Sequence, residues 1–469
     1  MREPARSGTV RASRGGRLEI RSAPATGTSA GACRARTRRY RAPARTRPPC
    51  RARAEEVRNN VTATAGSSPT AFPAPSYPME RTCPYAMPTG YGPLREHRPL
   101  SRVSLYDGRR VWLVSGSDVG RELLRDPRIS CDPAHPSFPC LTESMASRQV
   151  PGLPLIGVDD PLHAHQRRWV SSAFGIRRIA ARRPAIERTA VRLVDAMLAA
   201  GDRADLVRAY TTPLASDTTF ALLGVPHQDR PHVDELITRL LSPVDEEDGC
   251  TPEELLAQLL DYLKGLLTDR QHNPGDDLID DLVAAHRPLT RQDLDTLAMT
   301  CVVLMSGGNE TTSTALATAV LALLDHPAQL DRLRRDPSLM PDAVEELLRI
   351  SSVTDALPRV ATEDIDIAGH TIEAGDGVVF STMLMNRDPD VWDSPDTFDT
   401  HRRAGRHVAF GYGIHQCVGQ NLARAEMDIA LTTLLRRIPT IRLDVPSQQV
   451  RGVAVHVQLG GVAELPVTW

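Results

Sequence analysis

A single cysteine, Cys417, lies in a loop crowded with glycine, aromatic and histidine residues. The loop reads Phe410-Gly411-Tyr412-Gly413-Ile414-His415-Gln416-Cys417-Val418-Gly419, and an apolar pattern with helical spacing follows it at once. A thiol beside the N-terminus of a helix is stabilised as a thiolate by backbone N–H groups and by the helix dipole. The glycines permit a tight turn and the close approach of a large group. The loop therefore predicts a thiolate that binds a flat, bulky metal cofactor.

Read alone, the cysteine is compatible with two further roles. Unpaired cysteine is among the most buried residue types, so Cys417 could be a structural residue in a glycine-rich turn. A zinc site needs four ligands, whereas His415 and Cys417 provide two and the nearby sequence offers no further Cys or His pair. As a whole, the loop resembles the haem-binding loop of cytochrome P450 enzymes, F-x-x-G-x-x-x-C-x-G. The resemblance implies that Cys417 is the axial thiolate ligand of a haem iron and that Phe410, Gly411 and Gly419 contact the haem.

A long apolar segment between Thr290 and Leu324 is the second feature that bears on chemistry. Thr290 and Asp293 form a capping-box pattern at its start, and Pro327 follows as a stop. The segment therefore predicts one helix of about 35 residues, roughly 50 Å long, which must cross the core of a soluble domain.

Two glycines, Gly307 and Gly308, interrupt this segment and precede an acid and an alcohol, Glu310 and Thr311. Each glycine costs a helix about 1 kcal/mol relative to Ala, which indicates a kink or a close neighbour. The run 306–312 resembles the P450 central-helix motif A/G-G-x-D/E-T. The resemblance implies that Thr311 hydrogen-bonds dioxygen, that Glu310 relays protons from solvent and that the glycines leave room for O₂ and water. Without it, threonines that cap carbonyl groups in a bent helix would account for the same run.

Glu346 and Arg349 match the family's E-x-x-R pattern. By itself, such a pair on one helix face is an ordinary surface ion pair, worth well under about 1 kcal/mol. The resemblance implies a structural role, in which the pair locks the segment that leads to the cysteine loop. The family's usual third member is an arginine in a P-x-R-F segment, where this chain has Thr397; Arg402 is the candidate substitute.

Four basic residues are candidates for the propionate groups of the haem, which need fixed cationic or N–H partners. The run 160–167 resembles the family's D-P-x-H-x-x-x-R and contributes His163 and Arg167. Arg359 and His415 stand at the other positions where the family places such partners. Read singly, each would be an ordinary surface charge. The family's N-R-D-P turn also occurs at 386–389, so five motifs appear in order between about residue 77 and residue 469.

The composition is that of a globular protein, with 41% apolar and 24% charged residues among 469. Residues 1–58 differ, because they hold sixteen Arg, four Glu and no Lys, a net charge of +12. We expect a disordered tail over 1–75 and a haem domain over 76–469. The tail is either a functional basic arm or an extension without a role, with Met79 the more natural start; the second possibility is favoured and no nucleic-acid partner is expected.

The predicted fold is mainly α with small β-sheets near 103–114, 360–381 and 441–469, as in cytochrome P450 enzymes. No apolar stretch reaches the roughly 18 residues of a membrane span, and no signal-peptide core is present. We therefore expect a cytoplasmic protein without membrane contact. We also expect a monomer. The family implies haem b, O₂, a small organic substrate, and electrons from NAD(P)H through ferredoxin and its reductase, with natural-product tailoring as the setting. A peroxide-driven peroxygenase and a non-enzymatic haem-binding protein are the alternatives.

Overall fold

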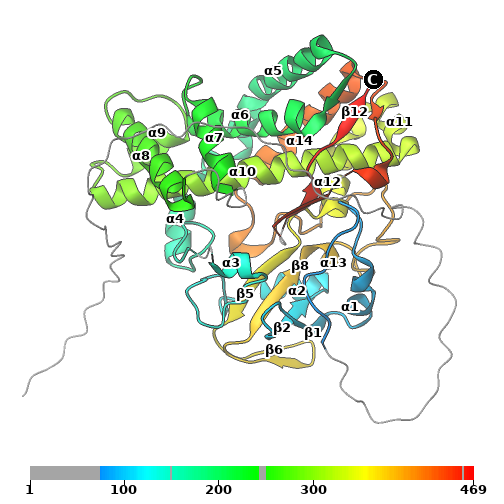
Figure 1. The fold of residues 1–469 in the computed structure, drawn as a ribbon. Helices are drawn as coiled ribbons and strands as arrows, with labels where there is room; N and C mark the ends of the chain where they lie inside the picture. Colours follow the sequence, from blue (N-terminus) through cyan, green and yellow to red (C-terminus); the bar gives the residue numbers. More distant parts are fainter. Residues whose placement is uncertain (1–73, 148–149, 242–249, 451, 457–458) are drawn as a thin grey trace, which may run out of the picture. The chain divides into compact units, whose positions relative to one another are not determined.

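The computed structural model describes residues 74–147, 150–241, 250–450, 452–456 and 459–469 (Figure 1). Apart from Cys250, they belong to one compact unit, Ala42–Val244 together with Thr251–Trp469. The predicted tail lies outside the described residues except for its last two, so its disorder stays a prediction. The unit is mainly helical with small sheets, which confirms the predicted fold class.

Helices dominate the described chain, and several begin where the sequence places a cap. Thr251, Asp277 and Thr290 each form a reciprocal capping box with the residue three positions on. The helices are α1 (Gly92–Glu96), α2 (Ser117–Leu123), α3 (Glu143–Ser147), α4 (Leu162–Ser171), α5 (Ile176–Ala200), α6 (Thr212–Leu223), α7 (Arg230–Leu241), α8 (Pro252–Arg270), α9 (Leu278–Ala285), α10 (Arg291–Asp325), α11 (Pro327–Arg335), α12 (Met340–Ser351), α13 (Thr382–Met385) and α14 (Gln420–Arg437). Shorter helical turns are η2 (Thr89–Tyr91), η3 (Val207–Thr211), η5 (Pro337–Leu339), η6 (Gly413–His415) and η7 (Ser447–Gln449).

Helix α10 is the long helix that the sequence predicts, with 35 residues. At its start, Thr290 Oγ1 accepts a hydrogen bond from the Asp293 N–H at 3.1 Å, and the Asp293 carboxylate accepts one from the Thr290 N–H at 2.9 Å. Helices α6, α8, α12 and α14 all pack against it, which buries most of its second half. In Figure 1 this helix runs unbroken past them, so it forms the central element of the core.

Among the described residues, the strands form four small sheets, and the largest has the order β1-β2-β8-β5-β3. Strands β1 and β2 form an antiparallel hairpin in the region 103–114, where a small sheet is predicted, with Val103 opposite Val111 and Gly108 in the left-handed region at a φ of 82°. The other sheets have the orders β4-β12-β9, β6-β7 and β10-β11. The strands are β1 (Leu100–Ser104), β2 (Arg110–Val114), β3 (Ile129–Ser130), β4 (Arg203–Asp205), β5 (Ala356–Ala361), β6 (Ile365–Ile367), β7 (His370–Ile372), β8 (Gly377–Ser381), β9 (Arg442–Leu443), β10 (Gly452–His456), β11 (Leu459–Val462) and β12 (Pro466–Thr468).

Length and apolar character together decide whether a helix can span a bilayer. Within the described ranges, no helix has both.

Candidate active site

The cysteine loop is a tight turn that ends at the start of α14. The Cys417 N–H donates to the Phe410 carbonyl at 2.8 Å, and the Gln416 N–H donates to the Gly413 carbonyl at 3.1 Å. Gly413 has a φ of 76°, and a Cβ atom there would lie 2.2 Å from the carbonyl oxygen of Leu124, so a glycine is required. Since α14 begins at Gln420, the loop presents the cysteine just before a helix N-terminus, as the sequence predicts.

The Cys417 side chain is exposed by surface area, yet burial raises the pKa of its thiol. Both statements hold because the exposed surface faces an internal cavity, which Cys417 lines. Backbone N–H groups of Gly419 and Gln420 and the guanidinium groups of Arg167 and Arg424 act in the opposite direction and lower this pKa. These groups would stabilise the thiolate once a metal ion replaces its proton.

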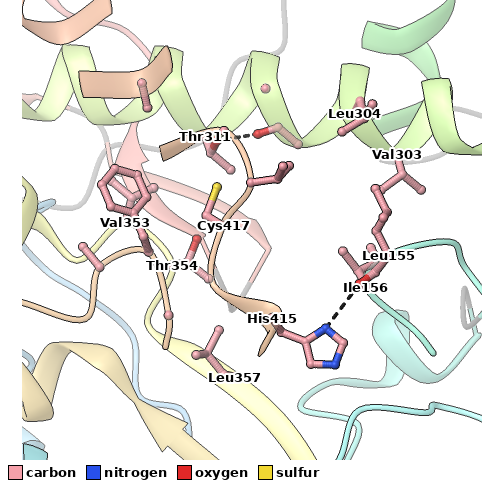
Figure 2. Close-up of a pocket in the computed structure, with 18 of the residues that line it drawn as sticks. Leu155, Ile156, Val303, Leu304, Thr311, Val353, Thr354, Leu357, His415 and Cys417 are labelled. Atoms are coloured by element: carbon pink, nitrogen blue, oxygen red, sulfur yellow. Dashed lines mark hydrogen bonds between the residues drawn. The ribbon is translucent and has the colours of Figure 1, made fainter. Parts of the chain in front are cut away.

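The cavity has a volume of about 650 Å³ and collects most of the predicted site residues. One wall is the cysteine loop and the opposite wall is α10, and Figure 2 shows Cys417 with its sulfur atom directed toward the cavity and Thr311 on the helix that bounds it. The lining of the cavity is mainly apolar and includes Leu155, Ile156, Val303, Leu304, Val353 and Leu357. The predicted residues on its surface are Arg167, Gly307, Gly308, Thr311, Arg359, Phe410, Gly411, His415, Cys417 and Gly419; His163, Glu310, Glu346 and Arg349 lie elsewhere.

The two glycines of α10 serve different purposes. A Cβ atom at Gly307 would meet nothing within 4 Å, because this position opens to the cavity. At Gly308 a Cβ atom would lie 2.7 Å from Thr219 Oγ1, so this glycine allows α6 to approach closely. Beside them, the Thr311 hydroxyl donates to the Gly307 carbonyl at 2.6 Å and lines the cavity.

Glu310 is half-buried, and it is the next residue, Thr311, that faces the cavity. Thr312 is buried and also lines the cavity, although no role is predicted for it from the sequence. Glu310, Thr311 and Thr312 are thus consecutive on α10, and the two threonines line the cavity.

Two of the predicted propionate partners have hydrogen-bonding capacity to spare. His163 is 2% exposed, and its Nδ1 lies 3.2 Å from an Asp160 carboxylate oxygen, while its Nε2 has no partner within the described chain. The Arg359 guanidinium lines the cavity and makes its single hydrogen bond among the described residues to the Pro358 carbonyl, at 2.7 Å. Burial lowers the pKa of both side chains, because a buried cation loses its hydration; at His163 the Asp160 carboxylate acts in the opposite direction.

The other two propionate candidates are engaged with the protein. Arg167 donates to the Gln416 carbonyl at 2.6 Å and so supports the cysteine loop. His415 Nδ1 lies 3.2 Å from the Leu155 carbonyl (Figure 2), and its Nε2 lies 3.3 Å from Cys131 Sγ. Burial and the neighbouring Arg359 lower the pKa of His415 to about 4, so the ring is neutral at neutral pH.

The contact with Cys131 belongs to a cluster that is not predicted from the sequence. Candidate ligand atoms of Cys131, Asp159 and His415 lie within 4.8 Å of one another. Arg359 is close enough to all three to influence their pKa values, and its positive charge disfavours a bound cation there. Cys417 is not a member of this cluster.

Glu346 and Arg349 are both fully buried and form a bidentate pair, with N–O distances of 2.7 and 2.8 Å. Arg349 also donates to the carbonyls of Asn386, Pro395 and Thr397. Arg402 is the substitute that the sequence suggests for the missing arginine, and its Nε lies 3.2 Å from Glu346 Oε1. These contacts tie helix α12 to the segment that precedes the cysteine loop.

Comparisons with known proteins agree with this geometry. Residues 225–439 match the family model described as cytochrome P450. The chain is 47% identical to pentalenic acid synthase of Streptomyces avermitilis, over 87% of this chain and 99% of the relative, and 42% identical to vitamin D3 dihydroxylase of Streptomyces griseolus, over 86% and 99%. The chain belongs to the cytochrome P450 family. Its fold superimposes on the crystal structure of cytochrome P450 MoxA from Nonomuraea recticatena with a TM-score of 0.78 and 39% identity, covering 84% of this chain and 98% of that one. This P450 is therefore a monooxygenase of a family that uses haem and electrons from a redox partner.

The residues of this P450 fit a haem. Cys417 offers its sulfur to the cavity, and the mainly apolar walls suit a flat, largely apolar ring. The unused N–H groups of Arg359, which lines the cavity, need the kind of acceptors that propionate groups would supply. A buried polar atom without a partner costs about 1–3 kcal/mol, so a ligand that satisfies it is expected.

A second glutamate of α12, Glu345, contacts residues on both sides of the cysteine loop of this P450. Its carboxylate accepts two hydrogen bonds from Arg424 of α14, at 2.6 and 3.1 Å, and lies 3.1 Å from His407 Nε2. Burial alone would raise the pKa of Glu345, but His407 and Arg424 outweigh it and lower the pKa to about 2. The ion pair therefore joins α12 to both sides of the loop.

The contacts of Glu345 with Arg424 and His407 should weaken in acid, when the Glu345 carboxylate is protonated. Because the folded-state pKa lies below the unfolded value, the stabilisation is complete above about pH 5 and is lost as pH falls toward 2. We expect Glu345→Gln to lower the free energy of unfolding by up to roughly 3 kcal/mol at pH 7 and by much less at pH 3. Urea unfolding at both pH values measures this, with the exposed Glu253→Gln as control. A variant that keeps the wild-type difference between pH 7 and pH 3 would contradict the prediction.

Proposed function

We propose that this P450 hydroxylates, or otherwise oxidises, a small and mainly apolar organic substrate. It would use O₂ and two electrons delivered one at a time by a separate ferredoxin, which a reductase reduces with NAD(P)H. The observation that carries the proposal is that Cys417 and Thr311 line the same mainly apolar cavity from opposite walls. In the overall reaction, one oxygen atom enters the substrate, and the other takes up two electrons and two protons and leaves as water.

The proposed cofactor is haem b, whose iron Cys417 would ligate and whose propionates His163, Arg167, Arg359 and His415 would bind. When bound, it supplies the oxidising chemistry, and the protein supplies positioning and protons. Arg167 and the N–H groups of Gly419 and Gln420 would hold the negative charge of the thiolate. The apolar walls would orient the substrate and exclude bulk water.

Thr311 and Glu310 are proposed to manage the protons. The Thr311 hydroxyl, anchored on the Gly307 carbonyl at 2.6 Å, is fixed at the cavity surface where it can hydrogen-bond dioxygen or water. Glu310, one residue away and half-buried, would carry protons from solvent. This pair favours an O₂-dependent enzyme over a peroxygenase, because peroxide brings its own oxygen atoms and protons.

The relatives favour natural-product tailoring as the setting. One of them is named for the synthesis of pentalenic acid, and another is named as a 20-oxo-5-O-mycaminosyltylactone 23-monooxygenase. We also propose that 76–469 forms one monomeric haem domain in the cytoplasm and that 1–75 is a separate basic tail. The charge of +12 over 1–58 supports the division.

Substitution of Thr311 tests the assignment. We expect Thr311→Val, in reactions with ferredoxin, reductase and NAD(P)H, to divert most NAD(P)H from product to hydrogen peroxide, a loss of coupling of about tenfold or more. Thr300→Val is the matched control, because the Thr300 hydroxyl bonds its i−4 carbonyl in the same helix, at 2.8 Å, but does not line the cavity. Equal coupling in wild type and Thr311→Val, or turnover supported only by peroxide, would favour the peroxygenase; haem that never consumes oxygen with any donor would favour a binding protein.

A further inference from the structure

A short turn on the wall of the cavity holds a leucine in a strained backbone conformation. Leu155 has a φ of 68°, in the left-handed region that leucine rarely adopts. The Ile156 N–H donates to the Pro154 carbonyl at 2.9 Å, so Leu155 is the middle residue of a γ-turn of the rare, strained form. Such strain persists only where the surrounding structure enforces it, and it is typical of ligand sites.

Both backbone polar groups of Leu155 are held by side chains from other elements. Its N–H donates to Oε1 of Gln166 on α4, at 2.9 Å. Its carbonyl lies 3.2 Å from His415 Nδ1, which Figure 2 shows as a dashed line. Because a carbonyl group can only accept, His415 Nδ1 carries the proton and donates it. Gln166 is 4% exposed, so bulk water cannot readily take its place.

These bonds belong to a closed circuit between α4 and the cysteine loop. Gln166 is followed on α4 by Arg167, whose guanidinium donates to the Gln416 carbonyl at 2.6 Å. Gln416 is in turn the next residue after His415, and it directly precedes the cysteine. The circuit therefore links the strained turn, the helix and the backbone beside the metal ligand, and each of its hydrogen bonds supports the others.

The turn also places apolar side chains beside the cysteine. Leu155 and Ile156 line the same cavity as Cys417. A glycine would adopt the φ of Leu155 without strain, but it would leave no side chain on the wall. The strained backbone thus keeps an apolar side chain on the cavity surface while its carbonyl group holds the cysteine loop.

We propose that Gln166 is a positioning residue for the haem, which holds the Leu155 turn and the cysteine loop in the arrangement that retains the cofactor. The inference rests on the proposed function, since haem must occupy this cavity. Gln166 is not among the described residues that line the cavity, so it acts through its neighbours. Without its acceptor, the Leu155 N–H loses its partner and the strained turn can relax. The apolar wall and the loop are then no longer tied together, and haem leaves more easily.

The rate at which the holoprotein gives up haem to excess apomyoglobin tests this without any turnover. Gln166→Met keeps the length of the side chain and removes the acceptor. We expect it to release haem about tenfold faster than wild type, as for the loss of one buried hydrogen bond. Gln166→Glu keeps an acceptor oxygen and should stay within about threefold of wild type. A Gln166→Met variant that releases haem at the wild-type rate would show that the inference is wrong.

Gln329→Met is the matched control for a general loss of stability. Gln329 Oε1 also accepts a hydrogen bond from a distant backbone N–H, that of Thr400 at 3.3 Å, but Gln329 is not a lining residue of the cavity. The control should lower the thermal unfolding temperature and leave haem release unchanged. If Gln329→Met and Gln166→Met release haem equally fast, Gln166 contributes only to general stability and the inference fails.

Hydrogen exchange in the wild-type holoprotein serves if Gln166→Met does not fold. The Leu155 amide should exchange slowly with D₂O, because Gln166 holds it in a buried hydrogen bond. Exchange as fast as in an unstructured peptide would contradict the inference.

The failure of the inference differs from the failure of the proposed function. A wild-type protein without the spectrum of thiolate-bound haem would end the proposed function. A wild-type protein with that spectrum, whose Leu155 amide exchanges freely or whose Gln166→Met variant retains haem as well as wild type, would end the inference alone.

Discussion

Cys417→Ser is expected to abolish the red-shifted band that carbon monoxide produces with reduced, thiolate-bound haem, and to lower substrate oxidation by several orders of magnitude. The reason is chemical, because a serine hydroxyl stays protonated at neutral pH and is a harder ligand than a thiolate. It cannot push electron density toward iron as the thiolate does. The loop should keep its fold, since its hydrogen bonds are made by backbone atoms and by Arg167 and not by the Cys417 side chain.

Cys131→Ser is the control for this experiment. Cys131 is the other cysteine among the residues that line the cavity, so it is the competing candidate for the axial ligand. Burial raises the pKa of the Cys131 thiol to about 12, which keeps it protonated and makes it a poor metal ligand. The carbon monoxide band should therefore persist in Cys131→Ser. A band retained in Cys417→Ser and lost in Cys131→Ser would reverse the assignment.

Arg349→Leu is expected to prevent the accumulation of folded, haem-containing protein. The change leaves the Glu346 carboxylate buried without its bidentate partner, and removal of one member of a buried ion pair costs about 3–5 kcal/mol. It also frees the carbonyls of Asn386, Pro395 and Thr397, which hold the segment before the cysteine loop. The total stability of a domain is only about 5–15 kcal/mol, so little would remain.

Haem content per protein and the thermal unfolding temperature measure this effect. Arg349→Lys should fail almost as badly, since an ammonium group cannot reproduce the planar fork that contacts five acceptor oxygens. Asp331→Asn is the control, because it breaks the Asp331–Arg334 pair, which has the same i,i+3 spacing but lies at the surface. That change should cost less than about 1 kcal/mol. An Arg349→Leu variant as stable as Asp331→Asn would show that the buried pair is not a structural lock.

Sequence patterns predict the parts of this site that depend on neighbours along the chain. The capping box at Thr290 sets the start of α10, and the glycine spacing sets the cysteine loop, since both depend on residues a few positions apart. The different roles of Gly307 and Gly308 can be recognised only from the packing of α6 against α10. The sequence does not show this contact, because α6 lies about 90 residues earlier. The contact between Cys131 and His415 joins residues that are 284 positions apart, and no periodic pattern in the sequence predicts such a contact.

The same limit applies to Arg402. Arg402 could be suggested from the chain because it lies close to the missing arginine of the P-x-R-F segment, but its bond to Glu346 is visible only in the fold. Resemblance to the family supplied the roles of Cys417, Glu310 and Thr311, which composition and spacing alone left open.

Helix α12 has two chemically different sides, and this division bears on how the enzyme can change. Leu348 and Ser351 face the cavity, whereas Glu345, Glu346 and Arg349 fasten the segments on either side of the cysteine loop. The residues that shape the substrate space and those that hold the metal ligand are therefore different positions of one rigid element. New substrates can be accommodated by exchange of side chains on the cavity side while the attachment of the loop is left intact. A single anchored helix thus lets specificity diverge among relatives without risk to the chemistry that they share.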